Sequence, residues 1–95
     1  MAAYVISDVE FRDPALVEKY RALAQASIAK YGGRYLARGG AIETVEGDWS
    51  PERIIIVEFP SMERFKSFYN APEYQEAKAL RRSATQGNML VVEGI

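Results

Sequence analysis

The stretch RIIIVEF at residues 53–59 decides the fold, because it is a β-strand with apolar side chains on both faces. Ile54 and Ile56 point to one side of the strand, whereas Ile55, Val57 and Phe59 point to the other. An antiparallel sheet with one face in water alternates apolar and polar residues instead. We therefore predict that both faces of the sheet containing this strand are covered.

The first and last predicted strands repeat this pattern. At residues 3–11, Tyr4 and Ile6 oppose Val5, Val9 and Phe11, and at residues 88–93, Met89 and Val91 oppose Leu90 and Val92. The chain's helices can cover one face only, and the other would leave an apolar patch larger than soluble monomers usually tolerate. We predict a homodimer that packs sheet face on sheet face. An RNA-binding sheet is rejected, because its third strand would need glycine and aromatic residues in place of RIIIVEF.

The segments around these strands complete a βαββαβ order. A helix is predicted from Pro14 to Tyr31, capped by Asp13 and ended by Gly32-Gly33. A strand over residues 34–45 follows, with a bulge at Gly39-Gly40, and residues 47–51 form a turn. Beyond the central strand come a short helix after Ser61, a second helix from Pro72 to Gly87, and the last strand. The prediction is an α+β, ferredoxin-like sandwich: one domain over residues 1–95, with a four-stranded antiparallel sheet and helices on one face.

Composition excludes several classes of function. The chain has 95 residues, no cysteine, no histidine and a formal net charge of −1. Thiolate and histidine metal sites, haem with a histidine ligand and a Ser-His-Asp triad are impossible within it, so we expect no metal and no cofactor. The charge gives no reason to bind nucleic acid or an anionic membrane. With no signal-like start and no run of about 20 apolar residues, we expect a cytoplasmic protein.

Several motifs together resemble a known family. They are YGGRYLARGG at residues 31–40, EGDW at 46–49, EFPS at 58–61, PEY at 72–74 and LR at 80–81. These are similar to the domain of unknown function 1330 family of the dimeric α+β barrel superfamily, over essentially the whole chain. The resemblance implies a ferredoxin-like dimer but no reaction. The superfamily also contains cofactor-independent monooxygenases, small-lactone isomerases and haem enzymes, and carrying those activities over is analogy of fold alone.

Two charged residues are candidates for catalysis. Arg38 precedes the Gly-Gly kink, where a bulge can turn its side chain into a cleft to hold a carboxylate; the alternative is a solvent-facing arginine. Glu58 interrupts an apolar strand, where a raised pKa would suit a general base or acid. The alternative for Glu58 is an ion pair with Arg38 or Arg53, or a place at the sheet rim.

Four more residues are candidates for ligand binding. Tyr74 and Arg81 match the family pattern, although an arginine at a helix C-terminus is also explained by the helix dipole. Trp49 lies in the turn, as a lid over a ligand or as a contact with the partner chain. Tyr4 is placed with Arg38, Glu58 and Tyr74 around a pocket between sheet and helices.

Two functions therefore compete. The first is a protein that binds or transforms a small anionic organic molecule in that pocket, by proton transfer, isomerisation or oxygenation without a cofactor. The second is a non-catalytic dimer in which the same residues are structural. The sequence leaves open whether the chain is an enzyme.

Overall fold

The chain forms four strands and three helices in a computed structural model that describes residues 1–11 and 13–95. Side chains at positions 9, 11 and 83–86 are not described, so the faces expected for Val9 and Phe11 lie outside it. The elements are β1 (Ala3–Phe11), α1 (Pro14–Lys30), β2 (Arg34–Arg38), β3 (Ile54–Phe59), α2 (Met62–Tyr69), α3 (Pro72–Ala84) and β4 (Thr85–Glu93).

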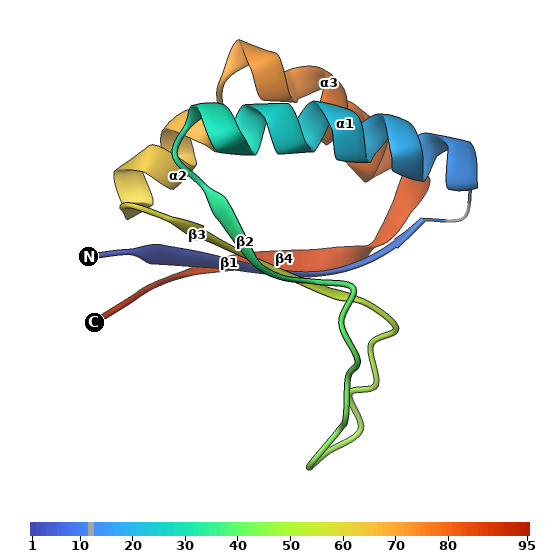
Figure 1. Ribbon diagram of the computed structural model, residues 1–95. Helices are drawn as coiled ribbons and strands as arrows, with labels where there is room; N and C mark the ends of the chain where they lie inside the picture. The colour runs from blue at the N-terminus through green and yellow to red at the C-terminus, as the bar shows by residue number, and fades with distance from the viewer. Residues whose placement is uncertain (12) are drawn as a thin grey trace.

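The sheet is antiparallel in the order β2-β3-β1-β4, and the helices lie on one of its faces (Figure 1). This arrangement confirms the predicted α+β, ferredoxin-like sandwich. The two central strands, β1 and β3, pair from Ala3 with Phe59 to Asp8 with Ile54. This register places the odd-numbered residues of both strands on the helix side, where Val5 and Val57 are buried.

Local sequence signals explain how the helices begin and end. Asp13 caps α1 by accepting a hydrogen bond from the backbone N–H of Ala15 at 3.0 Å, and Ser61 caps α2 in the same way. Gly32, with a φ of +82°, turns the chain out of α1. Gly33 lies so close to Ile28 and Phe59 that a Cβ on it would approach their side chains to 2.7 and 2.8 Å.

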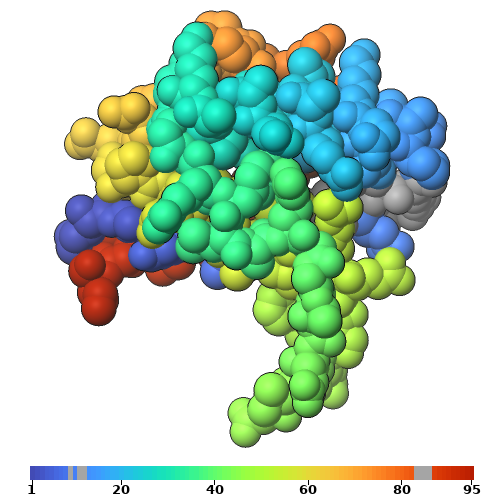
Figure 2. Space-filling view, in the orientation of Figure 1, coloured from blue at the N-terminus to red at the C-terminus, as the bar shows by residue number. Residues whose placement is uncertain are grey.

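The second predicted strand is shorter than expected. It ends at Arg38 instead of residue 45, and Gly39 adopts a φ of +74° that takes the chain out of the sheet. Residues 39–53 form a long arm that projects from the sheet on the side away from the helices (Figures 1 and 2). At the other end of the chain, the last helix ends earlier and the last strand starts earlier than predicted, since β4 begins at Thr85.

The core lies between the helices and the sheet. Phe59 of β3 packs against Phe65 and Phe68 of α2, with ring centroids 5.7 and 5.1 Å apart. Phe68 is 4.3 Å from the ring of Tyr74, which is 1% exposed and, with Phe59, is among the largest fully buried side chains. These aromatic contacts hold α2 and the start of α3 on the sheet.

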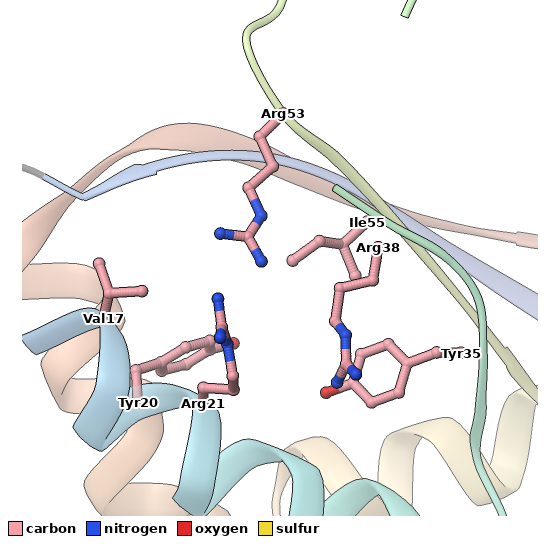
Figure 3. A pocket seen from close by; sticks show the side chains of 7 residues that line it. All are labelled: Val17, Tyr20, Arg21, Tyr35, Arg38, Arg53 and Ile55. Atoms are coloured by element: carbon pink, nitrogen blue, oxygen red, sulfur yellow. The ribbon is translucent and has the colours of Figure 1, made fainter. Parts of the chain in front are cut away.

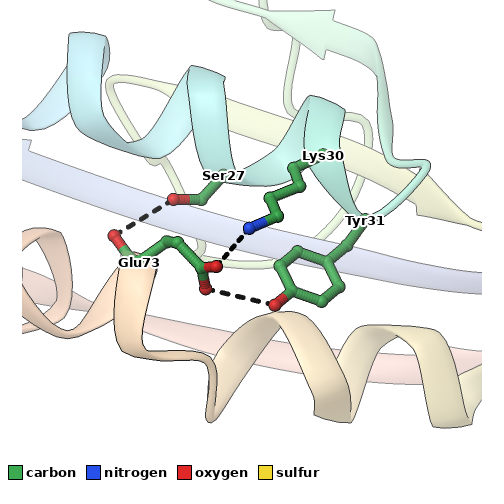
Figure 4. A network of polar contacts seen from close by, with 4 residues as sticks. All are labelled: Ser27, Lys30, Tyr31 and Glu73. Carbon is green, nitrogen blue, oxygen red and sulfur yellow. Dashed lines mark hydrogen bonds and ion pairs between the residues drawn. The ribbon is translucent and has the colours of Figure 1, made fainter.

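One polar network joins the end of α1 to the start of α3 (Figure 4). The Glu73 carboxylate forms an ion pair with Lys30 and accepts a hydrogen bond from the Tyr31 hydroxyl at 3.1 Å. Ser27 Oγ donates to the Glu73 backbone carbonyl at 3.2 Å. The network fixes how the two helices lie against each other above the sheet.

The opposite face of the sheet has no helix over it (Figure 1) and carries apolar side chains. Leu90 is 56% and Val92 is 48% exposed there, next to Tyr4, Ile6 and the even-numbered isoleucines of β3. We call this surface the open face. Its composition agrees with the two-sided pattern of the sequence.

Candidate functional site

A β-bulge in β2 turns Arg38 toward the helices. Tyr35 pairs with Val57, but the next pair along the ladder is Ala37 with Ile56, so Leu36 is an extra residue. In a regular strand Arg38 would point to the face opposite Tyr35; the extra residue brings both to the helix side. The sequence predicted an irregularity with this effect, but placed it at Gly39-Gly40.

Arg38 lines a pocket between α1 and the edge of the sheet (Figure 3). Arg21 reaches the pocket from α1 and Arg53 from the residue before β3. In Figure 3 these two guanidinium groups point toward each other, while that of Arg38 lies alongside the Tyr35 ring. We call these three residues the arginine cluster. The remaining lining residues are Val17, Tyr20, Tyr35 and Ile55, and the cavity measures about 30 Å³.

The positive charge of this cluster has little compensation. Arg53 Nε is buried and has no hydrogen-bond partner among the described residues. Arg38 stacks 4.4 Å from the centre of the Tyr35 ring and donates to the Gln25 side-chain oxygen at 3.4 Å, neither of which is an anion. Arg21 forms an ion pair with Glu18, at 3.6 Å, along α1. The site is therefore electropositive and has donors to spare.

All three arginines influence the pKa of the Tyr35 hydroxyl. Burial raises the pKa of Tyr35, while its interaction with Arg38 opposes that rise. The charges of Arg21 and Arg53 also lower this pKa.

A second cavity of about 40 Å³ lies behind the first and shares Tyr20, Tyr35 and Ile55 as lining. We call it the inner chamber. Apart from hydroxyl groups its lining is apolar; the residues not shared with the mouth are Val5, Ser7, Ile28, Val57, Phe59, Phe68, Tyr74 and Met89.

Two tyrosine hydroxyls meet at the inner chamber. The Tyr20 and Tyr74 oxygens are 3.1 Å apart, in hydrogen-bonding distance. Burial raises the pKa of both, against a lowering effect from the nearby charge of Arg81. Both groups therefore stay protonated at neutral pH and serve as hydrogen-bonding groups.

The residues predicted from the sequence divide between the two faces of the sheet. Arg38 lies at the mouth of the pocket and Tyr74 lines the inner chamber. Tyr4 and Glu58, which pair across β1 and β3, lie on the open face instead. Glu58 accepts a hydrogen bond from Arg34 Nε at 2.7 Å, so its ion-pair partner is neither of the two arginines considered from the sequence.

The other two candidates also lie away from the arginine cluster. Trp49 sits on the arm, where its indole N–H donates to Asp8 at 3.3 Å. Arg81 lines a shallow groove with Phe65, Tyr69 and residues 89–91, although its charge reaches the tyrosine pair. Sequence reasoning missed Arg21, Arg53, Tyr20 and Tyr35 as site residues. Tyr20-Arg21 on one helix and Tyr35 near Arg38 are the available signals, but neither shows that the pairs face each other.

Neither a metal site nor a membrane-spanning helix is found in the described part of the chain. No group of three or more Asp or Glu residues there is arranged to hold a metal ion. None of its helices has the length and apolar character needed to cross a bilayer.

Comparison with protein families identifies the chain. The profile described as "Domain of unknown function (DUF1330)" matches residues 2–95. The chain belongs to the DUF1330 family. A search of the curated proteins found no match. The family membership agrees with the resemblance carried by the motifs of the sequence.

Solved structures share the fold of this DUF1330 chain. A protein of unknown function from Rhodopseudomonas palustris is 19% identical, with a TM-score of 0.79 over 99% of this chain and 82% of that one. The cofactor-independent oxygenase SnoaB from Streptomyces nogalater is 13% identical, with a TM-score of 0.70 over 99% and 93%. A dimeric protein of unknown function and ferredoxin-like fold from Bacteroides fragilis is 16% identical, with a TM-score of 0.66 over 98% and 96%.

Proposed function

We propose that this DUF1330 protein is a homodimer that binds a small organic carboxylate at the arginine cluster of each subunit. One observation carries the proposal: Arg21, Arg38 and Arg53 line the same pocket, and the buried Nε of Arg53 has no partner among the described residues. A buried donor without a partner costs about 1–3 kcal/mol, which a bound anion would recover.

A carboxylate suits the pocket better than other small ligands. A guanidinium presents a planar fork of donors that matches the two oxygens of a carboxylate. Tyr20 and Tyr35 add hydroxyl groups, while Val17 and Ile55 supply apolar contact. The described lining contains three arginines and no acidic side chain.

The open face supports the dimer. Leu90 and Val92 are each about half exposed, and Tyr4, Ile6, Ile54 and Ile56 extend the apolar surface across the central strands. A second copy would bury this surface face to face, at a gain of about 25 cal/mol per Å² of apolar area. Two structurally similar proteins, from Bacteroides fragilis and Thermobifida fusca, are described as dimeric.

The proposal stops at binding. Burial raises the pKa of Tyr20 and Tyr35, which makes them poor bases at neutral pH. Glu58, the carboxylate considered from the sequence as a candidate base or acid, is on the far side of the sheet. The similarity to SnoaB at 13% identity supports a shared fold and no shared reaction.

NMR titration with propanoate tests the proposal at the atom that carries it. The Nε–H of Arg53 gives its own proton–nitrogen signal, which we expect to shift saturably as propanoate is added at constant ionic strength. Arg53→Met should weaken binding about tenfold or more, because it removes charge-assisted hydrogen bonds. Arg64→Met, which removes an exposed arginine of α2, is the matched control and should bind as the wild type does. Equal affinity in both variants would refute the site.

A further inference from the structure

The mouth with the arginine cluster and the inner chamber form one site of two chemically different parts. Tyr20, Tyr35 and Ile55 line both cavities, and Tyr20 and Tyr35 stand on opposite sides of the mouth in Figure 3. A ligand whose carboxylate is held by the arginines would reach the chamber by passing these shared residues. This step rests on the function proposed above.

The size of the chamber limits the part of the ligand that extends beyond the carboxylate. A water molecule needs about 10–15 Å³ of such space, and an engineered cavity of about 150 Å³ takes up benzene. The chamber, at about 40 Å³, has room for two or three atoms of that size, and the mouth, at about 30 Å³, has room for a carboxylate. An aromatic ring does not fit without moving the core, and cores resist such overpacking.

The polarity of the chamber limits it further. Most of its lining is apolar, which suits a short hydrocarbon segment. The paired hydroxyls of Tyr20 and Tyr74 supply oxygen lone pairs at the chamber wall, and Ser7, which is 5% exposed, adds a third hydroxyl. A hydroxyl on the ligand's far end would donate a hydrogen bond there, whereas a plain methyl end would not.

We infer that the ligand is a short aliphatic acid of about three or four carbons that carries a hydroxyl group remote from its carboxylate. The arginine cluster holds the carboxylate, and the Tyr20–Tyr74 pair selects the remote oxygen. Tyr74 is thus a specificity-determining residue, although it lies behind the mouth and is almost fully buried.

Competition between matched acids tests this inference. Affinities would be measured for propanoate, 3-hydroxypropanoate, 4-hydroxybutanoate, benzoate and 4-hydroxybenzoate, in the wild type and in Tyr74→Phe. We expect the hydroxy acids to bind about five- to tenfold more tightly than propanoate, the effect of one hydrogen bond. Tyr74→Phe should abolish this preference, so that the hydroxy acids bind no more tightly than propanoate does. Benzoate and 4-hydroxybenzoate should not bind.

The outcomes separate this inference from the function on which it rests. If all five acids bind alike and Arg53→Met weakens them all, the arginine site stands and the size and hydroxyl selection are refuted. A hydroxy-acid preference that persists in Tyr74→Phe also refutes the selection. If no acid binds, both the site and its selectivity fail. Should Tyr74→Phe not fold, Tyr20→Phe removes the partner hydroxyl instead. The comparison of propanoate with benzoate in the wild type still tests the size limit.

Discussion

Glu58 and Arg34 form an ion pair across β3 and β2, with Arg34 Nε donating to Glu58 Oε1 at 2.7 Å. The pair lies on the open face of the sheet, directly opposite in the β2–β3 register. Its geometry gives the charged residue within the apolar third strand a structural role. The arginine cluster lies on the other side of the same strand, beside Ile55.

Glu58→Gln therefore separates a structural from a catalytic role for this carboxylate. The Arg34 side chain is 71% and the Glu58 side chain 22% exposed, so we expect a loss of about 1 kcal/mol or less in the free energy of unfolding. Propanoate affinity, measured by the same NMR titration, should not change. A variant that folds normally but loses ligand binding would contradict this placement.

Arg38 is predicted to contribute to ligand binding, because the extra residue at Leu36 brings its side chain to the helix side of the sheet. We expect Arg38→Met to weaken propanoate binding about tenfold, as loss of one charge-assisted contact would. Leu36→Ala keeps the extra residue and the face of Arg38, and should bind as the wild type does. Circular dichroism on both variants would establish that the sheet is intact.

The sequence predicts the fold well because the deciding signal is redundant. Three strands are apolar on both faces. Because alternate residues of a strand share a face, the sequence shows which side chains lie together without any knowledge of the helices. The same redundancy hides which face the helices cover, since Ile54 and Ile55 are equally apolar. Tyr4 and Glu58 were for this reason expected in a pocket that lies on the opposite side.

The arginine cluster was only partly predictable for a different reason. Arg38 was expected at a cleft because glycines follow it, yet the bulge that turns it lies at Leu36, where no special residue stands. Arg21 and Arg53 come from separate elements and meet Arg38 only once the helix crosses the sheet edge. Local patterns contain no information about such a convergence.

The dimer is tested by charges placed on the open face. Leu90→Asp combined with Val92→Asp puts two carboxylates where a partner's apolar face is proposed to pack. Light scattering should give twice the chain mass of 10.7 kDa for the wild type and the single mass for the double variant. Ala22→Asp, on the exposed side of α1, is the control and should remain dimeric. A wild type that is monomeric at micromolar concentration would refute the dimer.

Acid should loosen the contact between α1 and α3 through Glu73. The hydrogen bond and charge of Lys30 hold the pKa of Glu73 below its usual value. A carboxylate with a lowered pKa in the folded state stabilises the fold above its unfolded pKa of about 4.3, and this contribution is lost as pH falls through the lower folded value. Between pH 7 and pH 3, the urea midpoint should therefore fall further for the wild type than for Glu73→Gln. Parallel losses in the two proteins would show that the Glu73 network in Figure 4 contributes nothing to the acid response.

Gly33 is predicted to be indispensable for packing rather than for its backbone angle. A Cβ at this position would approach Ile28 Cγ2 to 2.7 Å and Phe59 Cε1 to 2.8 Å, and both neighbours are buried in the core. Neither can move without displacing α1 or the aromatic cluster, so Gly33→Ala should cost about 1–3 kcal/mol in the free energy of unfolding. Gly40→Ala is the matched control, because nothing lies within 4 Å of a Cβ there. Chemical denaturation should leave Gly40→Ala near the wild type. Equal stability of the two variants would mean that the C-terminal end of α1 shifts to accommodate the added methyl group at little cost in free energy.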